Sequence, residues 1–245
     1  MPCSAFTYQN NTHVTCITGK ASTNARGVVV LETYYGGNGT STGQYTYNPL
    51  PYVESVSPTN GPMTGNTTLS ILGNALGSSL VDVESITVAG VSCLSITYKS
   101  NSELSCVTQP TDTPRTAPVV VTTISGGTSD STTSYTYNPL PIVKTVTPDH
   151  GPPSGGTLIY IHGEALGTSA DDLSTIVVAG HSCTSSANWY NSSFITCITA
   201  PRGEGGASGP VVVTTLSGGD GSTSMNAFFH YDDRAYILAA LVALF

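Results

Sequence analysis

Six cysteines are the residues of this chain whose type and spacing most clearly imply chemistry. They fall into three pairs whose members lie 13 or 14 residues apart: Cys3 with Cys16, Cys93 with Cys106, and Cys183 with Cys197. An even number of cysteines at nearly constant spacing is typical of a disulfide framework. Zinc is the competing explanation, but its sites usually draw on Cys-x-x-Cys or paired histidines, and the sequence has neither. We therefore predict three disulfides, which persist only in an oxidising compartment.

Catalysis needs a reactive group beside a base and a residue that orients the base. Asp149 beside His150 is the most suggestive pair, but the matching turn 90 residues earlier holds Thr and Asn, so we interpret the pair as turn chemistry. The carboxylates of Asp171-Asp172 and Asp232-Asp233 fall short of the six or more oxygens that a calcium site requires. The other histidines are scattered over expected turns and strands: His13, His162, His181 and His230. We predict no enzyme activity, no metal and no cofactor.

Four Asn-x-Ser/Thr sequons predict N-linked glycans, at Asn10, Asn38, Asn66 and Asn191. Together with the cysteines they favour an extracellular or cell-surface location. Trp189, Tyr190 and Phe194 flank the last sequon. They are interpreted either as core and glycan-stacking residues or as an exposed patch for a partner or a sugar. No signal peptide follows Met1, so we expect the true start to lie upstream.

The composition predicts an all-β protein and excludes one class of partner. Only 9% of the 245 residues are charged, with 7 Lys and Arg against 15 Asp and Glu, for a net charge of −8. Such a chain lacks the basic groove that nucleic acid requires. Ser, Thr, Gly, Val, Tyr and Pro dominate, and they favour strands and tight turns over helices.

A repeat of 90 residues organises the chain. Cys3, Cys93 and Cys183 are successively 90 residues apart, and identical Asn-Pro-Leu-Pro segments begin at Asn48 and Asn138. Each full repeat carries about seven short strand signals separated by Pro and Gly turns, as expected of a β-sandwich. Expected strands include 51–56, 68–72, 85–88, 119–121 and 135–137, then 141–146, 157–161, 175–178, 211–213 and 228–231. The proline-stiffened linkers predict a fixed, extended relation between repeats.

The repeats resemble the IPT/TIG domain, an immunoglobulin-like module shared by plexins and some transcription factors. The resemblance rests on Val56-x-Pro58-x-x-Gly61-Pro62-x-x-Gly65, Gly73-x-x-Leu76-Gly77 and Val88-Ala89-Gly90-x-x-Cys93, and on their counterparts Val146-x-Pro148-x-x-Gly151-Pro152-x-x-Gly155-Gly156-Thr157, Gly163-x-x-Leu166-Gly167 and Val178-Ala179-Gly180-x-x-Cys183. Asn66 departs from the family's second glycine, a change that we expect the fold to tolerate. The resemblance implies tandem immunoglobulin-like sandwiches.

These features predict four segments. The first unit, residues 1–49, matches only the rear half of a repeat, so its opening strands are either missing from a fragment or supplied by another chain. The second unit (51–138) and the third unit (141–231) are full repeats, and 232–245 is a hydrophobic tail.

The tail is about half as long as a membrane-spanning helix. It is interpreted either as the start of a transmembrane helix or lipid-anchor signal, or as an element that docks on a neighbouring subunit as a strand or a helix. The residues proposed for assembly or anchoring are Tyr236, Ile237, Leu238, Leu241, Val242, Leu244 and Phe245.

The preferred functional prediction is a non-enzymatic structural glycoprotein that self-associates through its tail and first unit into a rigid rod or head-to-tail filament. The alternative is part of a receptor or adhesion ectodomain resembling a plexin stalk, which binds a protein or glycan ligand. A transcription-factor-like DNA-binding module is opposed by the charge and the cysteines. An accessory domain of a carbohydrate enzyme rests on fold analogy alone.

Overall fold

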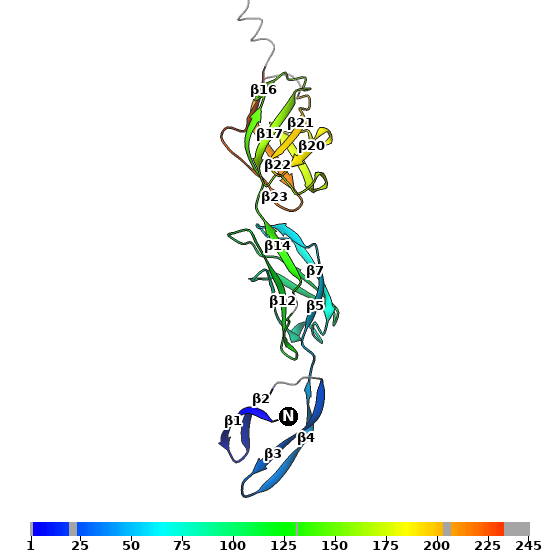
Figure 1. The fold of residues 1–245 in the computed structure, drawn as a ribbon, viewed down its shortest axis with the longest axis vertical. Coiled ribbons are helices and arrows are strands. Elements are labelled where there is room, and N and C mark those ends of the chain that lie inside the picture. Colours follow the sequence, from blue (N-terminus) through cyan, green and yellow to red (C-terminus); the bar gives the residue numbers. More distant parts are fainter. Residues whose placement is uncertain (1, 20–23, 131, 203–206, 233–245) are drawn as a thin grey trace, which may run out of the picture.

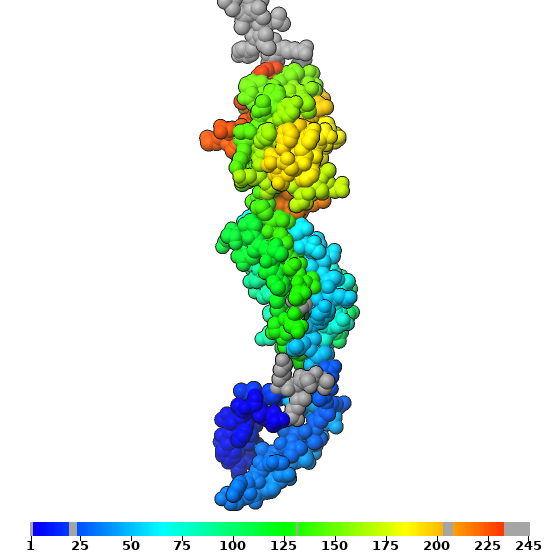
Figure 2. Space-filling view, viewed as in Figure 1, coloured from blue at the N-terminus to red at the C-terminus, as the bar shows by residue number. Residues whose placement is uncertain are grey.

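The computed structural model describes residues 2–19, 24–130, 132–202 and 207–232. Within these ranges the regular structure is strand, apart from three single 3-10 turns: η1 (Leu80–Asp82), η2 (Ala170–Asp172) and η3 (Thr184–Ser186). The three units follow one another along the long axis of the molecule (Figure 1). Figure 2 shows the same order on the surface, from blue at the N-terminal end to orange. The protein is a tandem array of all-β units.

The second unit is a sandwich of two sheets. Its strands are β5 (Tyr52–Ser57), β6 (Asn60–Pro62), β7 (Thr68–Asn74), β8 (Val83–Val88), β9 (Val91–Ser92), β10 (Ser95–Ser100), β11 (Glu103–Val107), β12 (Arg115–Thr123), β13 (Gly127–Thr128) and β14 (Ser134–Asn138). One sheet has the order β10-β11-β7-β5, and the other has β6-β14-β12-β8-β9 with β13 beside β12. The two sheets enclose one apolar core.

The third unit repeats this plan. Its strands are β15 (Ile142–Thr147), β16 (His150–Gly151), β17 (Leu158–Glu164), β18 (Leu173–Val178), β19 (His181–Ser182), β20 (Asn188–Asn191), β21 (Phe194–Ile198), β22 (Ala207–Thr215), β23 (Gly219–Asp220), β24 (Ser222–Thr223) and β25 (Phe228–Tyr231). The sheets run β20-β21-β17-β15-β24 and β16-β25-β22-β18-β19, with β23 beside β22. Both full units contain more strands than the seven expected, because strands of two or three residues, such as β9 and β13, pair beside the longer ones.

Strand β12 pairs with different neighbouring strands along its length. Its first half, Arg115 to Pro118, pairs with β14, and its second half from Val119 pairs with β8 of the same sheet. Proline lacks a backbone N–H, so Pro118 is a suitable residue for a strand to leave one partner. Alternation then decides the core: Leu69 and Ile71 of β7 point inward and are fully buried, while Thr68 is exposed.

Asn66 stands at a backbone position that requires a positive φ. Its φ is 60°, and the corresponding Gly156 has φ 82°. Both backbone N–H groups donate to the equivalent carbonyl, Thr108 in the second unit and Thr199 in the third, at 2.9 Å. Asparagine enters this left-handed region more readily than most residues. The turn is therefore the same in both units.

The first unit consists of two hairpins. They are formed by β1 (Cys3–Asn10) with β2 (His13–Thr18), and by β3 (Ala25–Thr33) with β4 (Gly37–Tyr47). They correspond in order to β10, β11, β12 and β13–β14 of the second unit, and the described part of this unit has no counterpart of β5 to β9. Apolar side chains are consequently exposed on both hairpins, with Phe6 at 74% and Ile17 at 67%. Completion of this half-sandwich, from the same chain or another, stays a prediction.

The tail cannot be compared with its prediction. Residues 233–245, which include every residue proposed for assembly or anchoring, lie outside the described ranges. In the residues that are described, no helix is long and apolar enough to cross a bilayer.

Candidate functional site

One asparagine side chain makes hydrogen bonds on both sides of the junction between the second and third units. Asn138 is the last residue of β14, and its Nδ2 donates to Oδ1 of Asn60 in its own unit at 3.2 Å. The same nitrogen donates to the carbonyl oxygen of Ser217 in the third unit at 3.2 Å. A primary amide has two N–H donors, so both bonds form at once. Asn138 thus ties the end of one sandwich to a loop of the next.

The junction between the first and second units repeats half of this arrangement. Asn48 lies 90 residues before Asn138, and its Nδ2 donates to the carbonyl oxygen of Ser125 at 3.2 Å. Ser125 and Ser217 begin the matching Ser-Gly-Gly turns of their units. A partner equivalent to Asn60 would belong to the half of the first unit that the described residues lack. The repeated bond indicates that each Asn-Pro-Leu-Pro linker docks on the following unit in the same way.

The Ser-Gly-Gly turn leaves little space beneath the linker. A Cβ added at Gly126 would lie 2.6 Å from the carbonyl oxygen of Pro49, and one added at Gly218 would lie 2.7 Å from that of Pro139. Both distances are below any real carbon–oxygen contact, so only glycine lets the linker pass this close. The turn also meets the preceding unit directly, since a Cβ at Gly219 would lie 3.0 Å from Cβ of Pro62.

A buried aspartate shapes the docking surface of the third unit. Oδ1 of Asp172 accepts a hydrogen bond from the backbone N–H of Ser217 at 2.8 Å, and Oδ2 accepts one from the Ser217 hydroxyl at 2.6 Å. Oδ2 also accepts from the backbone N–H and the hydroxyl of Thr168, at 2.8 and 3.1 Å. Asp172 is only 7% exposed. One carboxylate therefore joins the two loops that face the second unit.

The second unit has the same arrangement at its end nearest the first unit, and we call each buried aspartate with its four hydrogen bonds a brace. Asp82 accepts from Ser125 at 2.9 and 2.8 Å and from Ser78 at 2.8 and 3.1 Å. These bonds hold the pKa of Asp82 below its usual value of 3.8, and the bond from the Ser78 backbone N–H has the largest effect. Burial acts to raise the pKa of Asp172, but the hydrogen bonds from Ser217 and Thr168 outweigh it and the pKa is again lowered. Both aspartates are therefore charged at neutral pH.

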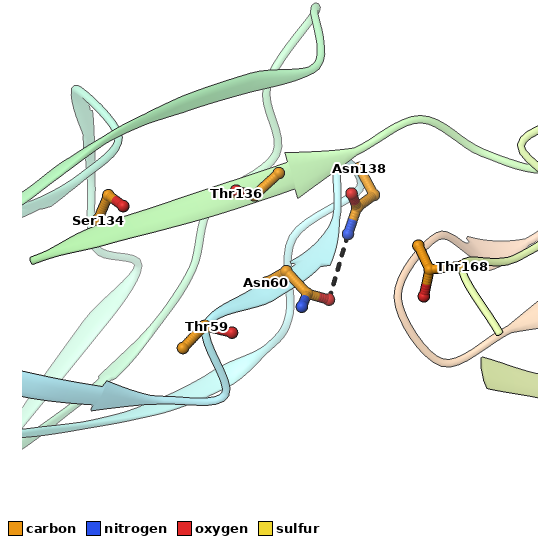
Figure 3. A pocket seen from close by; sticks show the side chains of 6 residues that line it. All are labelled: Thr59, Asn60, Ser134, Thr136, Asn138 and Thr168. Atoms are coloured by element: carbon orange, nitrogen blue, oxygen red, sulfur yellow. Dashed lines mark hydrogen bonds between the residues drawn. The ribbon is translucent and has the colours of Figure 1, made fainter. Parts of the chain in front are cut away.

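A hollow of about 350 Å³ opens at the junction between the second and third units. Figure 3 shows its lining, in which Thr168 faces the Asn60–Asn138 pair across the gap. The residues that line it are Thr59, Asn60, Ser134, Thr136, Asn138 and Thr168. Hydroxyls and amides donate and accept hydrogen bonds but do not titrate near neutral pH. The hollow therefore suits contact between units and is unsuited to acid–base chemistry.

The structure places the predicted cysteines and sequons as follows. Disulfides join Cys3 to Cys16, Cys93 to Cys106 and Cys183 to Cys197. In the second unit the bond connects β11 to the segment just before β10, so it clips one hairpin to itself. The asparagines of the four sequons, Asn10, Asn38, Asn66 and Asn191, are all exposed. Their glycosylation stays a prediction.

Of the histidine and aspartate residues considered for catalysis, Asp149, His150 and His230 lie together. Nδ1 of His150 lies 2.8 Å from Oδ1 of Asp149, and the His150 ring stacks on His230 at 4.8 Å between centroids. The hydrogen bond to Asp149 raises the pKa of His150. Across the described ranges, no three His, Cys, Asp or Glu side chains are grouped so that they could hold a metal ion.

Comparison with known proteins assigns the family. The family model of the IPT/TIG domain matches residues 51–137 and 141–231, which together form most of the chain. The chain belongs to the IPT/TIG domain family. The resemblance found in the sequence is thereby confirmed for the second and third units.

The related proteins include plexins. Plexin-B3 of Homo sapiens is 30% identical over 195 residues, covering 78% of this chain and 10% of that protein. Plexin-B3 of Mus musculus is 34% identical over 126 residues, covering 50% of this chain and 7% of that protein. The chain therefore spans a tenth or less of the length of these relatives. Exocyst complex component 2 of Drosophila melanogaster is 40% identical over 88 residues, 36% of this chain and 9% of that protein.

Among solved structures, the plexin A4 full extracellular region matches with a TM-score of 0.49 and 22% identity, covering 75% of this chain and 16% of that chain. A likeness of this size carries no argument about function. The relation to plexins and the three disulfides place this IPT/TIG protein outside the cell or at its surface. They favour the ectodomain alternative over the filament that we preferred from the sequence.

The junction residues were missed by sequence reasoning. The identical Asn-Pro-Leu-Pro segments marked both linkers, but they were interpreted as proline stiffening alone. The Ser-Gly-Gly turns and Asp82 with Asp172 recur at matching positions and supplied the remaining signal. Only the structure shows that the linker asparagine, the turn and the aspartate meet.

Proposed function

We propose that this chain is a non-enzymatic spacer within a cell-surface receptor or adhesion ectodomain, which holds the modules on either side of it at a fixed separation and angle. The observation that carries the proposal is the two-sided hydrogen bonding of Asn138, with Asn60 on one unit and Ser217 on the next. The same linker contact recurs at Asn48. A spacer needs a specific junction of this kind, because flexible linkers that did not dock on the next unit would let the units bend freely.

The brace beneath each junction supports the same role. Asp82 and Asp172 are buried and fully bonded, so each docking turn is rigid before the linker reaches it. Contact of Gly219 with Pro62 adds packing between the second and third units. Nothing among the described residues or the relatives supports filament formation, and the spacer proposal does not require a ligand.

Replacing Asn138 with alanine tests the spacer role. Asn138→Ala removes the hydrogen bond to the Ser217 carbonyl, the one bond of this side chain that crosses the junction, and such a bond is worth about 1 kcal/mol; bent arrangements should therefore become roughly 5-fold more populated. Small-angle X-ray scattering of the secreted chain should show a shorter average maximum dimension and a broader distance distribution. Asn101→Ala is the matched control, because Asn101 is an exposed asparagine on a hairpin of the same unit, away from the junction.

A second variant with two glycines inserted after Pro139 breaks the linker geometry without touching either sandwich. If neither this insertion nor Asn138→Ala changes the scattering, the junction does not set the shape of the chain and the spacer proposal is wrong. If the wild-type chain already scatters as a flexible string of units, the proposal is equally wrong.

A further inference from the structure

One hairpin turn has the same geometry in all three units. Asn10 pairs with His13, Ser100 with Glu103, and Asn191 with Phe194, each after a one-residue register shift. The shift leaves one bulged residue before each turn. The hairpin edge of the array therefore presents three equivalent positions.

Two of these positions are sequons with the same local hydrogen bonds. Oδ1 of Asn191 accepts from the backbone N–H and the hydroxyl of Ser193, at 2.9 and 2.7 Å. Oδ1 of Asn10 accepts from the same two groups of Thr12 at the same distances. At the middle position, the Ser100 hydroxyl accepts from the backbone N–H of Ser102 at 3.2 Å. In both sequons the turn engages the oxygen, and no bond involving Nδ2 of Asn191 is seen among the described residues.

In the third unit a group of stacked aromatic rings lies beside this turn. The ring of Phe194 stacks on Tyr190 at 5.0 Å and on His162 at 4.8 Å, and it lies parallel to Tyr160 at 6.2 Å. The four side chains come from β17, β20 and β21 and stand on the outer face of the sheet. Tyr190 is 57% exposed and Tyr160 is 42% exposed. We call these four residues the aromatic cluster.

The corresponding residues of the second unit are polar or aliphatic. The positions of Tyr190 and Phe194 are held in the second unit by Lys99 and Glu103, which form a salt bridge at 2.6 Å. In the first unit they are held by Gln9 and His13. The aromatic cluster is thus not needed to build the hairpin, because two other units form the same turn without it.

Asn191 is placed to deliver a sugar onto the aromatic cluster. Directly paired residues of antiparallel strands have Cβ atoms about 5 Å apart on one face of the sheet, so Asn191 and Phe194 project together. The bulge brings Tyr190 to this face beside them, while Trp189 turns inward and its Nε1 donates to the Leu166 carbonyl. A pyranose ring has an apolar face of C–H groups, and the negative face of an aromatic ring attracts such polarised hydrogens.

We infer that Asn191 carries an N-linked glycan whose first N-acetylglucosamine packs against Tyr190 and Phe194, so that the chain's own sugar covers the aromatic cluster. A tether of one side chain gives the attached sugar a high effective concentration at this surface, which a free glycan lacks. The glycan also shields an exposed apolar patch, which soluble proteins seldom leave open. This assignment goes beyond the spacer role and does not depend on it.

The test compares the full chain, secreted with high-mannose glycans, before and after enzymatic trimming. One enzyme leaves a single N-acetylglucosamine on each site, and a second removes the whole glycan. Trp189 is the only tryptophan and lies in the third unit, so its fluorescence on heating reports the unfolding of that unit. Peptide mass spectrometry measures the occupancy of Asn191 in the same samples.

We expect Asn191 to be occupied and the single remaining sugar to preserve the midpoint of the Trp189 transition. Complete removal should lower that midpoint by about 4 °C, the equivalent of one aromatic stacking contact. In Phe194→Leu, and separately in Tyr190→Ala, removal of the last sugar should change the midpoint by less than half as much. Each variant is compared with itself, so its own stability does not enter the difference.

A matched sequon is available in the second unit. Ser100→Asn creates Asn-Asn-Ser at the same turn, where Lys99 and Glu103 replace the aromatic rings. Removal of its glycan should leave the unfolding temperature of the second unit, measured by calorimetry, unchanged. An unoccupied Asn191 in the secreted chain overturns the inference, and so does a sugar effect that is equal in the wild type, Phe194→Leu and Ser100→Asn chains.

Discussion

Asp172→Asn is the sharpest probe of the brace beneath the junction. The carboxylate accepts four hydrogen bonds, two from Ser217 and two from Thr168, and asparagine keeps its shape but replaces one oxygen with an N–H donor. If the amide nitrogen takes the place of Oδ1, it meets the backbone N–H of Ser217, and two donors then face each other. Loss of one charge-assisted bond, with a buried N–H left unpaired, costs about 3 kcal/mol.

That cost converts into a large shift in the unfolding temperature of the third unit. For a domain of this size, 1 kcal/mol corresponds to roughly 4–8 °C, so the midpoint followed by Trp189 fluorescence should fall by about 12 °C or more. Asp171→Asn is the matched control, because Asp171 is the neighbouring exposed aspartate and the substitution removes the same charge. Asp82→Asn should destabilise the second unit by calorimetry and leave the Trp189 transition in place.

Two results would refute this reasoning. A midpoint for Asp172→Asn within 2 °C of Asp171→Asn would mean that the four bonds contribute little beyond the charge. A fall in the Trp189 midpoint of similar size in Asp82→Asn would mean that the braces do not act within their own units. In either case the buried aspartate would not be what makes the docking turn rigid.

Two further predictions concern Asp172 and the Ser-Gly-Gly turn that it binds. Because the pKa of Asp172 is lowered in the folded chain, its ionisation stabilises the fold at pH values above 3.8, and that contribution is lost as the pH falls through the folded pKa. Below about pH 4 the Trp189 midpoint should therefore fall less steeply with pH in Asp172→Asn than in wild type. Identical slopes would contradict the assignment. Gly218→Ala puts a Cβ 2.7 Å from the Pro139 carbonyl oxygen and should destabilise the third unit by about 1–3 kcal/mol in urea unfolding, while Gly39→Ala, with no atom within 4 Å, should be neutral.

Much of the fold could be predicted from the sequence because its causes are local or periodic. The Val-rich strands, the alternation of Leu69 and Ile71, and the turn at Asn66 follow from side-chain preference within a few residues. The disulfides connect residues 13 or 14 apart, within one hairpin, so spacing alone indicated the pairs. The number of strands was underestimated, because two-residue strands such as β9 and β13 are too short to show a pattern in the sequence and form only against a longer neighbour.

The period, the family and the positions of the linkers can all be inferred from the amino-acid sequence. The contacts of the linkers depend on the folded arrangement, because the two hydrogen-bond partners of Asn138 are 78 and 79 residues away and lie on opposite sides of a boundary between units. The aromatic cluster was decided in the same way, since Phe194 stacks on His162 through the register of β21 with β17. Contacts of this kind depend on which strands lie side by side, and strand order follows from packing the whole sandwich rather than from any local preference.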